Sequence, residues 1–393
     1  MINRSKNRGA WLSAVSVVAI SVTMAGMARA QGLNVANVEA DANWIQTAAI
    51  QSGPMSGAIA NYPGGNYIAP YQANYACIGL AVAYWDSQGL KPSYLTTAWN
   101  YLNWYGSTEV TDNQYDSEFQ SGAGYFMPDF SEASNGTWSA VEYDSTDSYA
   151  ATFLTALATT YRIDPTGYSM ALQNLKPAIL DACSDIYVTQ DTTDFDDGMT
   201  WCKPQYEAKY LEDNIETYQG LWAAQYLLST AALNDSADAT IAQNRANDMG
   251  YGIGDVLWDS GGPYYYVARS SNGVCNPPNT AAFGDALAEG FAGMYGFAGS
   301  NLPACLNYIH QYFPNWANPG DYGTTSGGVY QANYAPEIGW AYYNNNQASL
   351  AQSSATQIRN YAYNTAKLAW PWTPQDAGML IVLECNGEAE PRF

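Results

Sequence analysis

Positive charge is scarce in this sequence, whose 393 residues include 14 Lys plus Arg against 36 Asp plus Glu, for a formal net charge of −22. A surface this negative repels nucleic acid and anionic membranes, and it would repel a polyuronate as well. His310 is the sole histidine, and no Cys-x-x-Cys occurs, so the sequence gives little support to a zinc site of the usual kind or to a Ser-His-Asp triad. The composition favours a neutral or cationic ligand, and we expect neither a metal nor a cofactor.

Long apolar runs are missing after the first thirty residues, so we expect no membrane-spanning helix in the rest of the chain. At the N-terminus, three cations precede an apolar run that ends in a small-x-small pattern: Arg4, Lys6 and Arg8, residues 10 to 27, and Ala28-Arg29-Ala30. This order is typical of a signal peptide, with a membrane anchor as the alternative. We predict cleavage after Ala30 and a single catalytic domain over 31–393, secreted or periplasmic and monomeric.

The cysteines are candidates for disulfides, and one acidic run is a candidate for calcium binding. Six cysteines in an exported chain predict disulfides, with fifteen possible pairings: Cys77, Cys183, Cys202, Cys275, Cys305 and Cys385. The acids of residues 191–197 could bind calcium, but they lack the spacing of an EF-hand.

Aromatic residues are abundant, with 33 Tyr and 13 Trp. Tyr and Trp present a flat apolar face and a polar tip, which suits sugar rings that carry C–H groups on their faces and hydroxyls at their edges. Ordinary core packing is the alternative for much of this set. The aromatic content therefore favours a saccharide ligand without proving one.

Apolar residues at helical spacing predict twelve helices, with no linker between them. They cover 39–51, 71–85, 92–105, 144–161, 168–187, 213–228, 237–257, 285–296, 302–313, 337–343, 347–367 and 374–385. Pro177 is expected to bend or restart the fifth helix. We also predict two β-hairpins, one at the Asn135-Gly136 turn and one over 261–273.

The predicted helices alternate in character. The second, fourth, sixth, eighth and twelfth are apolar around most of their circumference, whereas the first, third, fifth, seventh and eleventh carry one apolar stripe. Buried helices alternating with covering helices predict an all-α fold, an (α/α)6 toroid of six helical hairpins. The parallel inner helices would then start at one face, surrounded by loops 106–143, 191–212 and 259–280.

Several of these helices begin with acids. Asp144 is expected to cap the fourth helix, with Asp147 reaching back as in a capping box, and Asp213 and Glu216 open the sixth. Thr373 and Asp376 open the twelfth in the same way. Capping explains each acid singly, while their recurrence predicts carboxylates gathered at one face.

Three segments at these positions resemble the six-hairpin glycosidases, over roughly residues 39–386: Asp144 to Phe153, Asp197 to Trp201, and Asp213 to Glu216. The resemblance implies the same toroid and glycosidase chemistry at the inner-helix starts. Thr146-Asp147 also matches the first half of the signature of an inverting family of endoglucanases, chitosanases and xylanases. Ser148 and Tyr149 depart from its second half, and no Ser-Glu-Gly occurs near residues 51–53, so that family's proton donor is not carried over.

Glycoside hydrolysis needs two carboxyls that flank the bond. We predict Asp147 and Asp213 as the pair, because each begins an inner helix of a different hairpin. Glu216, Asp144 or Asp285 would raise the pKa of the acid or serve as the acid itself.

Asp144 and Asp285 are also expected to contact the substrate, together with aromatic sugar platforms: Tyr149, Trp201, Trp104, Trp138 and Trp222. The predicted function is a glycoside hydrolase for a neutral or cationic polysaccharide or oligosaccharide, with inversion expected. A polysaccharide lyase on the same toroid, or a non-catalytic glycan-binding envelope protein, remains open.

Overall fold

The computed structural model describes residues 35–107, 128–141, 144–191, 197–204, 206–318, 335–365, 367–368, 372–385 and 393. Residues from Gly32 to Phe393 form one compact unit. The predicted signal peptide and most of the 106–143 loop lie outside the described residues. None of the helices in the described part is long and apolar enough to cross a membrane.

Helices make up most of this unit. They are α1 (Val35–Ala48), α2 (Pro70–Asp86), α3 (Pro92–Tyr105), α5 (Thr146–Ile163), α6 (Ser169–Asn174), α7 (Lys176–Thr189), α8 (Leu211–Ser229), α9 (Ser236–Gly252), α10 (Phe283–Met294), α11 (Leu302–Tyr312), α12 (Pro336–Asn344), α13 (Ala348–Arg359) and α14 (Pro374–Glu384). The predicted helices match these elements within a few residues at most ends. Pro177 lies in the first turn of α7 and separates it from α6, which confirms the predicted restart.

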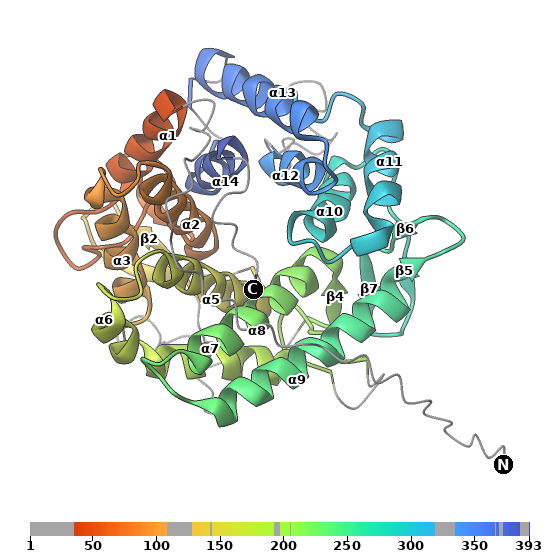
Figure 1. The fold of residues 1–393 in the computed structure, drawn as a ribbon, viewed down its shortest axis with the longest axis horizontal. Coiled ribbons are helices and arrows are strands. Elements are labelled where there is room, and N and C mark those ends of the chain that lie inside the picture. The colour runs from red at the N-terminus through yellow and green to blue at the C-terminus, as the bar shows by residue number, and fades with distance from the viewer. Residues whose placement is uncertain are drawn as a thin grey trace. The chain divides into compact units, whose positions relative to one another are not determined.

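The inner helices form a closed ring. In order, α2, α5, α8, α10, α12 and α14 each contact the next, and α14 contacts α2 again (Figure 1). The remaining long helices pack outside this ring, with α1 against α2 and α14, α7 against α5 and α8, and α11 against α10 and α12. The described part of the chain is thus an α-helical toroid-type arrangement.

Burial explains which helices are inside. Every residue of α5 from Thr146 to Tyr161 is buried. Its threonines tolerate this because their hydroxyls bond to carbonyls one turn back, as Thr155 does to Ala151 and Thr159 to Thr155. In α9, by contrast, the buried residues form one stripe: Ala239, Ala242, Ala246, Met249 and Gly252. The predicted alternation of buried and covering helices is confirmed.

The ring closes where α14 crosses α2. A Cβ atom on Gly79 of α2 would overlap the backbone of Gly378, and one on Gly378 would overlap the carbonyl of Tyr75. Only glycine allows two helix backbones to approach this closely. The two glycines therefore set the distance between the first and the last inner helix.

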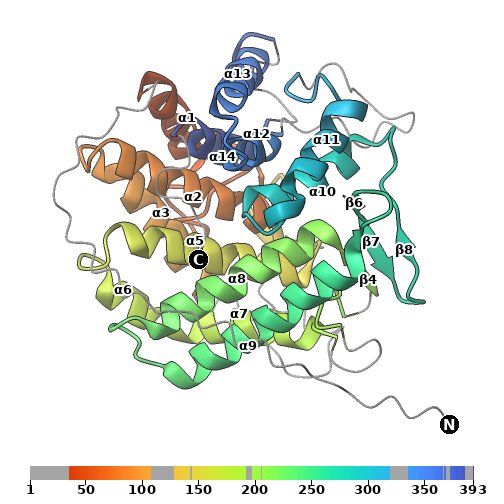
Figure 2. The ribbon, with the colours of Figure 1, turned by 45° about the vertical axis from the view of Figure 1, so that its right-hand side comes forward.

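Short antiparallel strands connect the helices at one end. One sheet has the order β1-β2-β3 (Tyr67–Ile68, Asp129–Glu132, Trp138–Val141), and its β2-β3 hairpin turns at Asn135-Gly136, where Gly136 has φ 81°. That predicted hairpin is confirmed. A second sheet has the order β4-β7-β8 (Ala208–Tyr210, Ala268–Ser270, Cys275–Asn276), visible beside α8 in Figure 2.

The hairpin predicted over 261–273 is wrong in its details. Tyr264 and Tyr265 form β6 and pair with β5 (Trp258–Asp259), whereas β7 pairs with β4 and β8. Residues 261–273 therefore contribute strands to two sheets. β6 pairs with β5, and β7 pairs with β4, which leads into α8.

The predicted disulfides are not found, since the structure contains none among the six cysteines. Five of the six are buried, where cysteine behaves as a small apolar residue. Burial, rather than cross-linking, accounts for the positions of these five, of which Cys77, Cys183 and Cys305 lie in helices and Cys202 and Cys385 lie outside them.

Candidate active site

Most inner helices begin with a carboxylate, and these carboxylates lie close together. Acids occupy the first turns of α5, α8, α10, α12 and α14. We refer to the group as the acidic cluster, which consists of Asp144, Asp147, Glu212, Asp213, Glu216, Asp285, Glu337 and Asp376.

Carboxyls of the cluster affect one another's pKa. Burial, followed by the charge of Asp147, raises the pKa of Asp213 well above its usual range. Burial and then the charges of Asp144 and Asp285 raise the pKa of Glu212 to about 7. Negative charges act at this strength only over short distances. Asp213 in the first turn of α8 therefore lies near Asp147 in the first turn of α5.

Glu212 lies at the centre of these interactions. Besides Asp144 and Asp285, its charge acts on Tyr71 of α2 and on Glu337 of α12. It is half-buried, as is Asp213. Glu212 thus faces groups on most of the inner ring and keeps some access to solvent.

Glu337, in the first turn of α12, is a buried carboxyl with a raised pKa. Burial and then the charge of Asp376 raise its pKa to about 8, with a smaller contribution from Glu212. Gln375 donates to its Oε1 over 3.3 Å. A carboxyl in this state carries a proton near neutral pH and can give it up.

Asp147 is completely buried, and donors occupy its oxygens. Ser145 Oγ and the Ser148 amide donate to Oδ1 at 2.6 and 2.8 Å, and Thr200 Oγ1 donates to Oδ2 at 2.5 Å. Burial raises its pKa to about 6 against these hydrogen bonds. In this position the two oxygens of Asp147 already accept hydrogen bonds from the protein's own donors.

The predicted cap of α5 is wrong by one residue. Ser145, not Asp144, is the N-cap, and its hydroxyl accepts from the Ser148 amide. The Thr146 amide donates to the Cys202 carbonyl at 2.6 Å, which fixes the chain one residue later than expected. Asp144 is therefore released from the helix and exposed. At the start of α14, the predicted Thr373–Asp376 capping box is confirmed.

Within the cluster, Glu216 lies one turn after Glu212 on α8 and is hydrogen-bonded to tyrosines of α2. The hydroxyls of Tyr71 (2.7 Å) and Tyr75 on α2 both donate to its Oε1, and Tyr295 after α10 donates to the Tyr75 hydroxyl at 3.2 Å. Its Oε2 is buried without a hydrogen-bond partner among the described residues. Burial raises the pKa of Glu216 well above its usual value. Glu216, predicted as a catalytic residue, is thus buried and held by two tyrosines of α2.

The predicted aromatic platforms are dispersed. Tyr149 is buried next to the cluster, and its hydroxyl donates to Asp129 at 2.9 Å. Trp201 is half-buried, with the Lys209 ammonium 4.2 Å from its ring centroid. Trp138 lies half-buried on β3.

Two tryptophans lie away from the cluster. Trp222 is ten residues after Glu212 on α8, about 15 Å along the helix axis. It packs edge-on against Tyr218, away from the acidic cluster. Trp104 ends α3 and packs against Phe130.

Asp191 and Asp197, the described acids of the 191–197 run, pair with cations. Lys209 is completely buried, and its Nζ lies 2.7 Å from Asp191 and 2.6 Å from Asp197. Arg269 adds a second cation 2.5 Å from Asp197. No group of three possible metal ligands occurs among the residues that the structure describes. This network holds the loop before α8 in place.

Replacing Lys209 by Ala is expected to destabilise the protein by about 3–5 kcal/mol, because buried carboxylates then lose a partner. Chemical denaturation of Lys209→Ala measures the effect. Lys91→Ala is the control, since it removes an exposed ion pair to Glu39 at 3.3 Å and should change stability by less than about 1 kcal/mol. Equal losses in the two variants would contradict the structural role of Lys209.

The raised pKa values predict that stability falls as pH rises. The folded pKa values of Asp147, Glu212 and Glu337, about 6, 7 and 8, exceed the ordinary values. The folded protein therefore holds protons that the unfolded chain releases, and this stabilisation, present in full below pH 4, is lost through pH 6–8. We expect the Tm to decrease by at least about 5 °C between pH 5 and pH 8.

Thermal unfolding across this range tests the expectation. Glu337→Gln removes one titrating group and should flatten the slope. A Tm that rises toward pH 8 would contradict the assignment.

The sequence interpretation missed two members of the cluster, Glu212 and Glu337. Glu212 directly precedes Asp213, to which the sequence pattern assigns the helix start, and Glu337 is expected only to begin the helix 337–343. The signal was present, because Glu337 follows Pro336 at the first turn of an inner helix, as Asp376 follows Pro374. A search for acids in the first turn of every predicted inner helix identifies both residues.

No family profile and no curated protein sequence matches this chain. Solved structures do resemble it. A wild-type glycosidase aligns with a TM-score of 0.51 and 13% identity, over 90% of this chain and 96% of its own. A glycosidase variant in complex with glucose aligns with a TM-score of 0.50 and 13% identity, over 91% and 97%. A β-1,3-1,4-glucanase from a Paenibacillus species gives 0.50 and 10%, over 89% and 91%. At these identities the chain shares the α-helical toroid-type fold of these proteins.

Proposed function

We propose that this protein is a secreted, monomeric glycoside hydrolase on a six-hairpin (α/α)6 toroid, acting on a neutral or cationic polysaccharide or oligosaccharide. The observation that carries the proposal is the acidic cluster, in which carboxyls from several inner helices meet and raise one another's pKa. Glycosidases in complex with glucose and acting on β-glucan share the fold, which supports a saccharide substrate.

Glu337 and Glu212 fit the two roles that the reaction needs. Glu337, with a pKa of about 8, is protonated near neutral pH and would give its proton to the leaving oxygen. Glu212 has a pKa of about 7 and solvent access, so it is the carboxyl of the pair that ionises first and would act as the base. Half-buried Asp213, predicted as one of the catalytic pair, is proposed here as a substrate contact beside Glu212.

Inversion is the proposed stereochemistry. Glu212 begins α8 and Glu337 begins α12, and α10 lies between these helices in the ring. In this proposal the two carboxyls stand far enough apart for a water molecule to enter beside the sugar, as inversion requires.

A polysaccharide panel tests the proposal. The purified chain, without residues 1–30, is incubated with soluble β-glucans, xylan and chitosan, and reducing ends and ultraviolet absorbance are followed. Release of reducing ends without absorbance supports hydrolysis, and proton NMR of the first product gives its anomeric form. Formation of an unsaturated product would instead indicate a lyase, and binding without any product a non-catalytic protein.

A further inference from the structure

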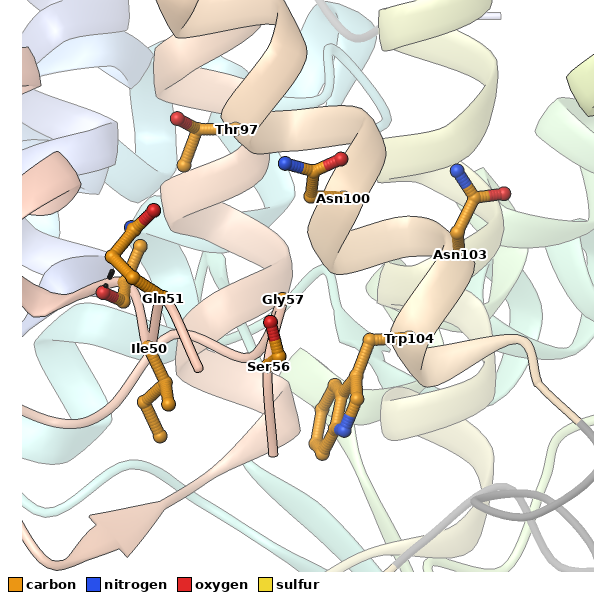
Figure 3. Close-up of a pocket in the computed structure, with 9 residues that line it drawn as sticks. Ile50, Gln51, Ser56, Gly57, Thr97, Asn100, Asn103 and Trp104 are labelled. Carbon is orange, nitrogen blue, oxygen red and sulfur yellow. Dashed lines mark hydrogen bonds between the residues drawn. The ribbon is translucent and has the colours of Figure 1, made fainter. Parts of the chain in front are cut away.

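A pocket separate from the acidic cluster lies between the 49–57 segment and α3. Its volume is about 390 Å³. Figure 3 shows its side chains along one stripe of α3 and on the facing segment: Ala49, Ile50, Gln51, Ser56, Gly57, Thr97, Asn100, Asn103 and Trp104. None of these residues belongs to the acidic cluster.

The lining is uncharged, although the chain carries a net charge of −22. Its polar groups are three side-chain amides and two hydroxyls, from Gln51, Asn100, Asn103, Ser56 and Thr97. An amide offers both donors and an acceptor, which matches sugar hydroxyls that also do both. The three amide residues are exposed, so they remain accessible to a ligand. Charged ligands find no ion partner here.

Backbone hydrogen bonds and a close glycine contact fix one wall of the pocket. The Ile50 amide donates to the Ala58 carbonyl at 2.8 Å, and the Gly57 amide donates back to the Ile50 carbonyl at 2.9 Å. Gly57 has φ 103°, and a Cβ atom there would lie 2.8 Å from the Asn100 carbonyl oxygen. A wall fixed in this way loses little conformational freedom on binding.

Packing links the pocket to the end of the ring that carries the cluster. The Trp104 and Phe130 rings are 5.6 Å apart, and the neighbouring Asp129 accepts from Tyr149 in the first turn of α5. Tyr149 in turn lies against Tyr71, with 5.6 Å between ring centroids. The pocket is thus lateral to the cluster on the same end of the helices.

We propose that this pocket is a second saccharide site that holds a non-reacting part of a neutral glycan. The ligand class rests on the proposed function, but binding here does not require the acidic cluster to be catalytic. Asn100 and Asn103 supply amides one turn apart on α3, and Trp104 bounds the pocket below them (Figure 3).

Affinity electrophoresis of the full chain in gels that contain mixed-linkage β-glucan, xyloglucan or glucomannan tests the proposal. A Glu337→Gln background keeps the polysaccharide intact. Adding Asn100→Ala and Asn103→Ala, both at exposed positions, is expected to raise the dissociation constant for the retained polysaccharide by at least about tenfold, since several hydrogen bonds to the ligand are lost.

The control carries Asn244→Ala and Asn247→Ala. These are exposed asparagines at the same spacing on the outer helix α9, and we expect no change. The inference is overturned if the pocket variant binds as the control does, or if no polysaccharide retards the parent protein. Loss of binding in the pocket variant, together with no hydrolysis by the wild type, would support the second site and refute the hydrolase. Hydrolysis by the wild type, together with unchanged binding by the pocket variant, would support the hydrolase and refute the second site.

Discussion

Glu337→Gln is expected to reduce hydrolysis of an unactivated polysaccharide by about 10²–10⁴-fold, which is the usual contribution of a general acid. The amide has the size of the acid but no proton to transfer, and burial leaves little room for water to replace it. Reducing-end assays with the variant and the wild type measure the loss. Circular dichroism verifies that the helices are intact.

Substrate choice distinguishes the two proposed roles. An aryl glycoside with an activated leaving group needs little acid help, so Glu337→Gln should recover most of its activity on that substrate. Glu212→Gln should stay inactive, because the base is still required, and added azide should restore turnover by acting as the nucleophile. Glu207→Gln, at an exposed glutamate, is the control with the same chemical change. Wild-type rates in both cluster variants would refute the proposed pair.

Gly378→Ala is expected to have the largest effect on folding, at about 3 kcal/mol or more. Overpacking usually costs 1–3 kcal/mol, and here the new methyl would overlap the carbonyl of Tyr75 in the backbone of α2, which cannot rotate away. The corresponding drop in Tm is about 6 °C or more. Thermal and chemical unfolding give both values.

Gly284→Ala is the matched control. Gly284 lies in the first turn of α10, has an ordinary φ, and a Cβ atom there would meet nothing within 4 Å. The substitution should leave stability unchanged or raise it slightly, since alanine favours a helix. A Gly378→Ala protein as stable as the control would show that the α2–α14 crossing can widen freely.

Local patterns predicted the framework well. The third helix was expected over 92–105 and spans Pro92–Tyr105, since Pro92 fixes its start and Gly106 follows its last residue. The Asn135-Gly136 turn predicted the β2-β3 hairpin because glycine readily adopts the positive φ it needs. The order of inner and outer helices followed from which helices were apolar around most of their circumference and which carried one apolar stripe.

Interactions between distant segments were harder to predict. Nothing near Ser145 in the sequence reveals the bond between Thr146 and the carbonyl of Cys202 that moves the cap. One oxygen of Asp147 accepts from Thr200, which approaches from another loop. The disulfide prediction failed for a similar reason, since the number of cysteines does not distinguish a buried free thiol from a disulfide.

The glycine crossing also bears on how the protein is made. Gly79 and Gly378 are 299 residues apart (378 − 79), so the first inner helix leaves the ribosome long before its final neighbour is synthesised. Until then the apolar surface of α2 that α14 later covers stays open to other chains, and contacts over such separations form slowly. Assembly is therefore completed only after translation has nearly finished, and a chaperone that shields α2 during this interval should increase the yield of folded protein.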